Sequence, residues 1–197
     1  KAAYLKPLME GDIVSCFSPV QHLFHPQRYK PSIRLDLKLP KEPISIMPSY
    51  SVFENEWIVL TDGARLAARV WMPEGPGPFP AVLEYLPYRK RNGTSARDES
   101  TYPVFAEAGI AGVRVDIRGS GESDGVIDGE YTERELSDGC EIVAWIAKQD
   151  WSNGKVGMMG ISWGGFNALQ IAALHPPALK AVISIASTVD RYNDDIH

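Results

Sequence analysis

The alternation of hydrophobic and polar residues along the chain changes near residue 50. Before that point the one patterned stretch is 33–39, whose strict alternation is typical of a half-buried strand. Residues 1–50 as a whole hold seven of the fifteen prolines and show no helical period. We therefore expect residues 1–50 to form a Pro-rich N-terminal arm that lies on a main domain of residues 51–197.

From residue 57 onward the pattern predicts a hairpin and then strands that alternate with helices. The apolar runs 57–60 and 66–72 flank an Asp62-Gly63 turn, as the two strands of a β-hairpin do. Further strands are expected at 81–86, 112–116, 155–159 and 181–185, and helices at about 100–108, 132–147 and 165–175. This order is typical of an α/β protein with a mostly parallel sheet and helices on both faces.

The second expected helix carries its own start signal. Thr132 and Glu135 have the spacing of a capping box, in which each side chain accepts a hydrogen bond from the other residue's backbone N–H. Apolar residues recur behind them at the helical period. The face expected to point at the sheet consists of Leu136, Cys140, Val143, Ile146 and Ala147.

The strongest chemical signal is Gly160-Ile161-Ser162-Trp163-Gly164, a G-x-S-x-G sequence between an expected strand and an expected helix. A serine at such a turn has a strained backbone, and only small residues fit two positions before and after it. Gly160 and Gly164 occupy those positions. The N–H groups that begin the next helix would point at a developing oxyanion. The sequence therefore predicts a nucleophile at Ser162, with an incidental serine in a Gly-rich turn as the alternative.

Tyr88 lies just past the expected strand at 81–86, at the carboxyl end of the strand, where this fold class binds ligands. Its phenol could donate a hydrogen bond to an oxyanion, or the ring could simply pack, and position alone leaves both interpretations open. The charged residues that follow it, Arg89, Lys90 and Arg91, are expected to form a solvated loop.

A second loop, residues 118–123, follows the expected strand at 112–116 and is rich in glycine. Its glycines, together with Gly125, have the spacing G-x-G-x-x-x-G and not the G-x-G-x-x-G of dinucleotide-binding turns. No amphipathic helix begins at Gly121 either. We interpret this segment as a loop that borders the active site.

Composition narrows the class of protein. Apolar residues make up 44% and charged residues 23% of the chain, which indicates a globular protein, and a net charge of −5 argues against nucleic-acid binding. No apolar run is long enough to span a bilayer, so we expect no membrane partner. Cys16 and Cys140 are expected to be free thiols, and no metal or cofactor is expected. Without a secretion signal a cytoplasmic location is favoured.

Four motifs occur in order and together resemble the CocE/NonD hydrolases, which include cocaine esterase, α-amino-acid ester hydrolases, β-lactam acylases and X-Pro dipeptidyl-peptidases. They are Pro87-Tyr88-Arg89-Lys90, the segment from Asp116 to Ser123, the segment from Trp151 to Gly157, and the segment from Gly160 to Gly165. The resemblance begins near Val52. It implies an α/β-hydrolase fold with Ser162 as nucleophile, and an oxyanion hole made by the backbone N–H of Trp163 and the hydroxyl of Tyr88.

The resemblance also implies that the acid and the base of the triad lie further along, beyond His197, so the fold is expected to be incomplete at its C-terminus. A local Asp190–His197 pair is the disfavoured alternative. His175 is expected at the end of a buried helix, away from the nucleophile, and His22 and His25 on the surface of the arm. Asp194 or Asp195 lies about where α-amino-acid ester hydrolases bind the substrate ammonium.

The function expected from these residues is hydrolysis of an ester or amide of a small molecule or short peptide through an acyl-enzyme. The alternative within the enzyme class is an X-Pro dipeptidyl-peptidase. The alternative outside it is a catalytically silent fragment or binding module that lacks the triad acid and base. Partners other than substrate could be the remainder of the same chain or a second copy of it.

Overall fold

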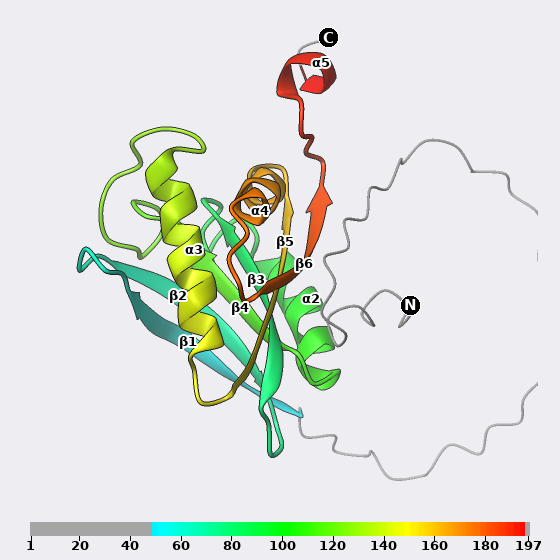
Figure 1. The fold of residues 1–197 in the computed structure, drawn as a ribbon. Coiled ribbons are helices and arrows are strands. Elements are labelled where there is room, and N and C mark those ends of the chain that lie inside the picture. Colours follow the sequence, from blue (N-terminus) through cyan, green and yellow to red (C-terminus); the bar gives the residue numbers. More distant parts are fainter. Residues whose placement is uncertain (1–48, 196–197) are drawn as a thin grey trace, which may run out of the picture.

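Six strands form one mixed sheet in the computed structural model, which describes residues 49–195 (Figure 1). The elements are β1 (Tyr50–Val59), β2 (Arg65–Pro73), β3 (Phe79–Leu86), α2 (Ser95–Glu107), β4 (Ala111–Asp116), α3 (Glu133–Ala147), β5 (Ser152–Ile161), α4 (Trp163–Ala173), β6 (Leu179–Ile185) and α5 (Arg191–Asp195). The strand expected at 33–39, Cys16, His22, His25 and His197 lie outside the described residues.

The strand order is β1-β2-β4-β3-β5-β6. β1, β2 and β4 pair antiparallel, whereas β3 pairs parallel with both β4 and β5, and β5 pairs parallel with β6. The expected α/β architecture, a mostly parallel sheet entered through a hairpin, is confirmed. β3 lies between β4 and β5. Because β3 and β5 are parallel neighbours, their carboxyl ends lie side by side.

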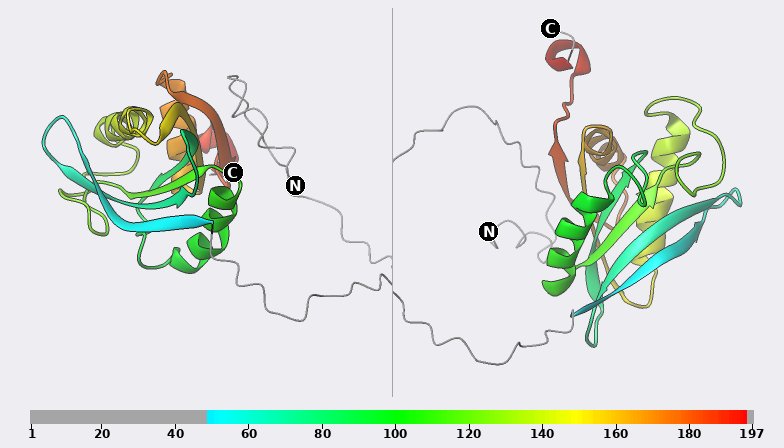
Figure 2. Two further views of the ribbon diagram at one scale, coloured as in Figure 1. Left: turned by 90° about the horizontal axis from the view of Figure 1, so that it is seen from below. Right: turned by 180° about the vertical axis from the view of Figure 1, so that it is seen from behind.

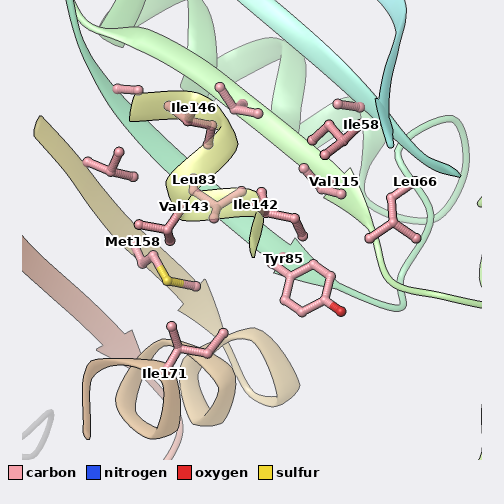
Figure 3. Close-up of a cluster of buried hydrophobic side chains, with 14 of the residues drawn as sticks. Ile58, Leu66, Leu83, Tyr85, Val115, Ile142, Val143, Ile146, Met158 and Ile171 are labelled. Atoms are coloured by element: carbon pink, nitrogen blue, oxygen red, sulfur yellow. The ribbon is translucent and has the colours of Figure 1, made fainter. Parts of the chain in front are cut away.

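Helices cover both faces of the sheet, as expected: α2 lies on one face, and α3 and α4 lie on the other (Figure 2). The larger core lies under α3 and α4 and joins Leu83, Val115, Ile142, Met158 and Ile171 (Figure 3). The smaller core lies under α2, where the rings of Trp71 and Tyr102 stack with centroids 4.4 Å apart. No helix in residues 49–195 is long and apolar enough to cross a membrane.

The buried face of α3 differs from the expected one. Val143 and Ile146 are fully buried, but Leu136, Cys140 and Ala147 are only partly buried at the edge of the core. The helix is turned so that its glycine, Gly139, meets α4, and a Cβ there would lie 2.2 Å from Ile171 Cδ1. Close approach of the two helices, rather than the apolar period alone, sets which face is buried. Burial raises the pKa of the Cys140 thiol, which disfavours the reactive thiolate form.

Two elements begin about five or more residues earlier than the pattern predicted, and the others begin within about three residues of it. β1 starts at Tyr50 rather than residue 57, because its first half is an exposed edge strand whose polar residues hide the alternation. α2 starts at Ser95 rather than residue 100, since its first turns carry charged groups that are paired inside the protein. Asp98 is fully buried and bonds Arg114 of β4 at 3.2 Å, while Arg97 bonds Glu84 of β3.

Candidate active site

Ser162 stands at the turn between β5 and α4 with φ 54° and ψ −117°, a conformation that L-residues rarely adopt. The turn is held by its backbone. Ser162 N–H donates to the Ile185 carbonyl at 2.8 Å, and Phe166 N–H donates to the Ser162 carbonyl at 3.0 Å. The side chain does not cap its own helix, and the residue is exposed. The expected strained turn is therefore present, and it leaves the hydroxyl accessible.

The glycines around Ser162 are required by close packing. A Cβ on Gly160 would lie 2.2 Å from the carbonyl carbon of Gly164, and one on Gly164 would lie 2.7 Å from Leu86 Cδ2. Gly165 is as tightly enclosed, because a Cβ there would lie 2.4 Å from Ser187 Oγ. These distances explain why the turn needs glycine two residues before and after the serine.

The backbone N–H of Trp163 points at the hydroxyl oxygen of Tyr88, with 3.4 Å between the nitrogen and the oxygen. Tyr88 follows β3 and Trp163 follows β5, so the adjacency of these strands brings together residues 75 positions apart. Trp163 is the first residue of α4, and its N–H has no acceptor within that helix. A backbone N–H and a tyrosine hydroxyl thus lie together beside Ser162.

The segment that carries Tyr88 is held by the Gly-rich loop after β4. Asp116 Oδ1 accepts the backbone N–H of Lys90 at 2.7 Å, and its Oδ2 accepts that of Glu122 at 3.3 Å. Ser120 Oγ donates to the Pro87 carbonyl at 2.7 Å. Burial raises the pKa of Asp116, and the two backbone donors act against that rise. The loop 118–123 therefore borders the candidate site, as expected.

The expectation that residues 89–91 form a solvated loop is wrong for Lys90. Its side chain is fully buried, where the ammonium bonds Asn55 Oδ1 at 2.6 Å and forms an ion pair with Glu122. The buried charge is tolerated because it is paired and hydrogen-bonded. Arg89 and Arg91 are exposed.

The glycines of this loop serve packing. Gly119 has φ 76°, and a Cβ there would lie 2.4 Å from the Ile127 backbone nitrogen. A Cβ on Gly121 would lie 2.0 Å from Asp116 Oδ2. The close approach of backbone to backbone and to a carboxylate accounts for both residues without a bound phosphate.

Comparison with known proteins agrees with this geometry. The X-Pro dipeptidyl-peptidase (S15) family matches residues 62–197, more than half of the chain. This chain belongs to that family. It is 32% identical over 145 residues to cocaine esterase from Rhodococcus, and the match covers 73% of this chain and 25% of that protein.

Two solved structures resemble this S15 family member over most of its length. A CocE/NonD family hydrolase from Staphylococcus aureus has a TM-score of 0.60 and 28% identity, covering 68% of this chain and 27% of that one. An α-amino acid ester hydrolase has a TM-score of 0.60 and 25% identity, covering 84% and 30%. The fold is that of the α/β-hydrolases. The chain spans about a quarter of the length of the curated relatives it matches.

The expected ammonium-binding residues, Asp194 and Asp195, both lie in α5. Asp194 lies in α5, which stands beyond the carboxyl end of β6 and clear of the sheet (Figure 1). Its partners are local: Thr188 Oγ1 donates to its carboxylate, and its N–H donates to the Asp190 carbonyl at 3.0 Å. Asp195 lies in the same short helix.

Of the disfavoured Asp190–His197 pair, the structure describes only Asp190, and its bonds are local. Asp190 accepts the backbone N–H of Asn193 at 3.1 Å and its amide at 2.6 Å, as a cap of the first turn of α5. These bonds lower the pKa of Asp190. His197 lies outside the described residues.

His175, the one histidine of the described range, lies two residues past the end of α4. At 1.5 Å per residue the helix separates it from Ser162 by about 20 Å, so it cannot receive the serine proton. Within residues 49–195 no group of His, Cys, Asp and Glu side chains could hold a metal ion.

Sequence reasoning missed two carboxylates that organise the site, Asp116 and Glu135. Asp116 was expected as the last residue of a strand and the first residue of a family motif, with no contacts assigned to it. Glu135 was recognised only as a helix cap, although the capping box was the signal that could have led to its other contacts.

Proposed function

We propose that this chain supplies the nucleophile and the oxyanion hole of a serine hydrolase that cleaves an ester or amide through an acyl-enzyme. The observation that carries the proposal is the 3.4 Å approach of the Trp163 N–H to the Tyr88 hydroxyl beside the strained Ser162. An oxyanion hole needs two such donors aimed at one point. Family membership supports the same reaction class.

In the proposed reaction Ser162 Oγ attacks the carbonyl carbon of the substrate, and its proton passes to a histidine base. The electron pair of the C=O bond moves to oxygen, and that oxyanion accepts hydrogen bonds from the Trp163 N–H and the Tyr88 hydroxyl. When the oxyanion collapses, the bond to the leaving group breaks and the leaving group takes the proton. Water then cleaves the acyl-enzyme by the same steps and regenerates Ser162.

The histidine base and its acid partner are proposed to lie beyond His197. The family order of nucleophile, acid and histidine fits this, and His175 is about 20 Å from Ser162 by helix length. We propose a small-molecule or short-peptide ester or amide as substrate. The name of the matching family makes a peptide that begins with X-Pro the second candidate substrate.

Activity-based labelling tests the proposal. The full-length gene product is treated with a fluorophosphonate probe, beside Ser162→Ala and the control Ser137→Ala, which changes an exposed serine of α3. We expect labelling in the parent and the control and none in Ser162→Ala, with all three folded. Labelling at another serine would refute the assignment, and absence of labelling and turnover in the parent would favour the catalytically silent alternative.

A pair of chromogenic substrates distinguishes an esterase from an X-Pro dipeptidyl-peptidase. A p-nitrophenyl ester reports esterase activity, and an X-Pro p-nitroanilide with a free amino terminus reports dipeptidyl-peptidase activity. Preference for the anilide by kcat/KM, lost when the amino terminus is acetylated, would select the peptidase.

A further inference from the structure

The carboxylate of Glu135 joins the first turn of α3 to the residue before that helix and to the start of α4, next to Ser162. The residue is 6% exposed and lies in the first turn of α3. Its Oε1 accepts hydrogen bonds from the indole Nε1–H of Trp163 at 2.6 Å and from the Asn167 side-chain amide at 2.7 Å. Its Oε2 accepts the backbone N–H of Tyr131 at 2.9 Å. All these partners are donors, which a carboxylate can satisfy and an amide cannot.

Half of the expected capping box is present. Thr132 Oγ1 accepts the backbone N–H of Glu135 at 3.2 Å, as expected. The return bond, however, goes to Tyr131, one residue before the cap, and not to Thr132. Tyr131 has φ 55°, a strained value for a non-glycine residue. Glu135 therefore does more than close its own helix, because it also holds a strained residue in front of it.

The other two bonds reach the start of α4. Trp163 and Asn167 are four residues apart and so lie on one face of that helix. The ring of Trp163 also packs against the ring of Tyr131, with centroids 5.2 Å apart. Glu135 thus holds the Trp163 side chain directly and holds the tyrosine on which that side chain rests.

We propose that Glu135 is a positioning residue for the oxyanion hole. The backbone N–H of Trp163 has no acceptor within α4, and its direction is set by the angles on either side of its peptide plane, ψ of Ser162 and φ of Trp163. Anchoring the indole to the buried carboxylate fixes those angles and keeps the N–H aimed at the point it shares with the Tyr88 hydroxyl. This inference rests on the proposed function, since it assigns Glu135 a task in that same site.

The main test compares Glu135→Gln, Trp163→Phe and the double variant in the full-length gene product, assayed on a p-nitrophenyl ester. The control is Glu133→Gln, which removes an exposed carboxylate from the same turn of α3. Since a small misplacement near the reacting atoms costs up to about 10²-fold, we expect each single variant to lower kcat about 10- to 100-fold with KM changed less than about threefold. Trp163→Phe keeps a ring for Tyr131 and loses the indole N–H.

The double variant shows whether the two residues act together. If Glu135 acts through the indole, the double variant is no slower than the slower single variant, because the same contact is removed twice. Independent losses that multiply would overturn the proposal, as would a Glu135→Gln protein with a lower melting temperature but a kcat per folded molecule within about twofold of the parent. If Glu135→Gln does not fold, Trp163→Phe alone decides by the same kcat criterion.

A measurement that needs no turnover separates this inference from the proposed function. In protein labelled with ¹⁵N-tryptophan, the backbone and indole signals that disappear in Trp163→Phe are those of Trp163. We expect Glu135→Gln to shift both signals and to speed exchange of the indole proton, whereas Glu133→Gln leaves them in place. An unmoved backbone signal would overturn the positioning role whether or not the protein is an active hydrolase.

Discussion

The N–H of Trp163 and the hydroxyl oxygen of Tyr88 approach to 3.4 Å, beyond the usual range of an N–H···O hydrogen bond. The two groups therefore face each other without a strong bond between them. In the proposed reaction a substrate oxygen lies to one side of this pair and accepts from both groups, so that the weak contact is exchanged for two stronger ones.

Replacing Tyr88 by Phe tests the hydroxyl as an oxyanion donor. We expect kcat on a p-nitrophenyl ester to fall about 10²–10³-fold, because the lost bond is strongest in the transition state. KM should change much less, and the melting temperature should be nearly unchanged, since the ring remains. A fall in kcat of less than about threefold would mean that Tyr88 only packs.

Asp116→Ala tests the carboxylate that holds the Tyr88 segment. The change leaves the N–H groups of Lys90 and Glu122 without their acceptor. Each N–H that stays buried lowers the free energy of unfolding by about 1–3 kcal/mol. The free energy of unfolding should fall accordingly, and kcat should fall because Tyr88 loses its support.

The matched control is Asp128→Ala, which removes an exposed ion pair with Arg134. An exposed pair contributes less than about 1 kcal/mol, so this variant should unfold like the parent. Equal urea midpoints for the two alanine variants would contradict the role given to Asp116.

Local signals were sufficient for Ser162 and for most of the fold. Ser162 sits in a five-residue motif in which Gly160 packs against the backbone of Gly164, and near-continuous apolar runs mark the central strands β3 and β4. Such features depend on residues close in sequence, so the sequence reveals them.

Long-range polar contacts were not predictable in the same way. Lys90 looked like a surface residue because its partners, Asn55 and Glu122, lie more than 30 positions away. The charged first turns of α2 looked like a loop for the same reason, since Asp98 pairs with Arg114 of another element. A charged residue reveals its burial only when the residue that neutralises it is known.

The ion pair between Lys90 and Glu122 predicts a pH dependence of stability. The hydrogen bond from the Lys90 ammonium lowers the pKa of Glu122 below its ordinary value of 4.5. A carboxyl with a lowered pKa in the folded protein stabilises the fold at pH values above that ordinary value, and this contribution is lost as pH falls through the lower folded value.

The measurement is the urea midpoint of the parent and of Glu122→Gln from pH 6 to pH 3. The parent should be the more stable protein at pH 6, and the difference should shrink toward pH 3 as Glu122 takes up a proton. Asp116, whose pKa is raised by burial, titrates in both proteins, so the difference between them, and not either curve alone, reports on Glu122. A difference independent of pH would show that the Glu122 charge does not stabilise the fold.

The last prediction concerns residues 1–197 expressed alone: they should hydrolyse p-nitrophenyl esters far more slowly than the full-length gene product. Ser162 needs a base, and His175 stands about 20 Å away past the end of α4. Without a base, binding and oxyanion stabilisation leave about 10³–10⁴-fold over water, as in proteases without a triad. His175→Ala should therefore leave turnover by the full-length product within about twofold of the parent. Turnover by residues 1–197 within about tenfold of the full-length product, lost in His197→Ala or Asp190→Ala, would instead make the local pair the working base and acid.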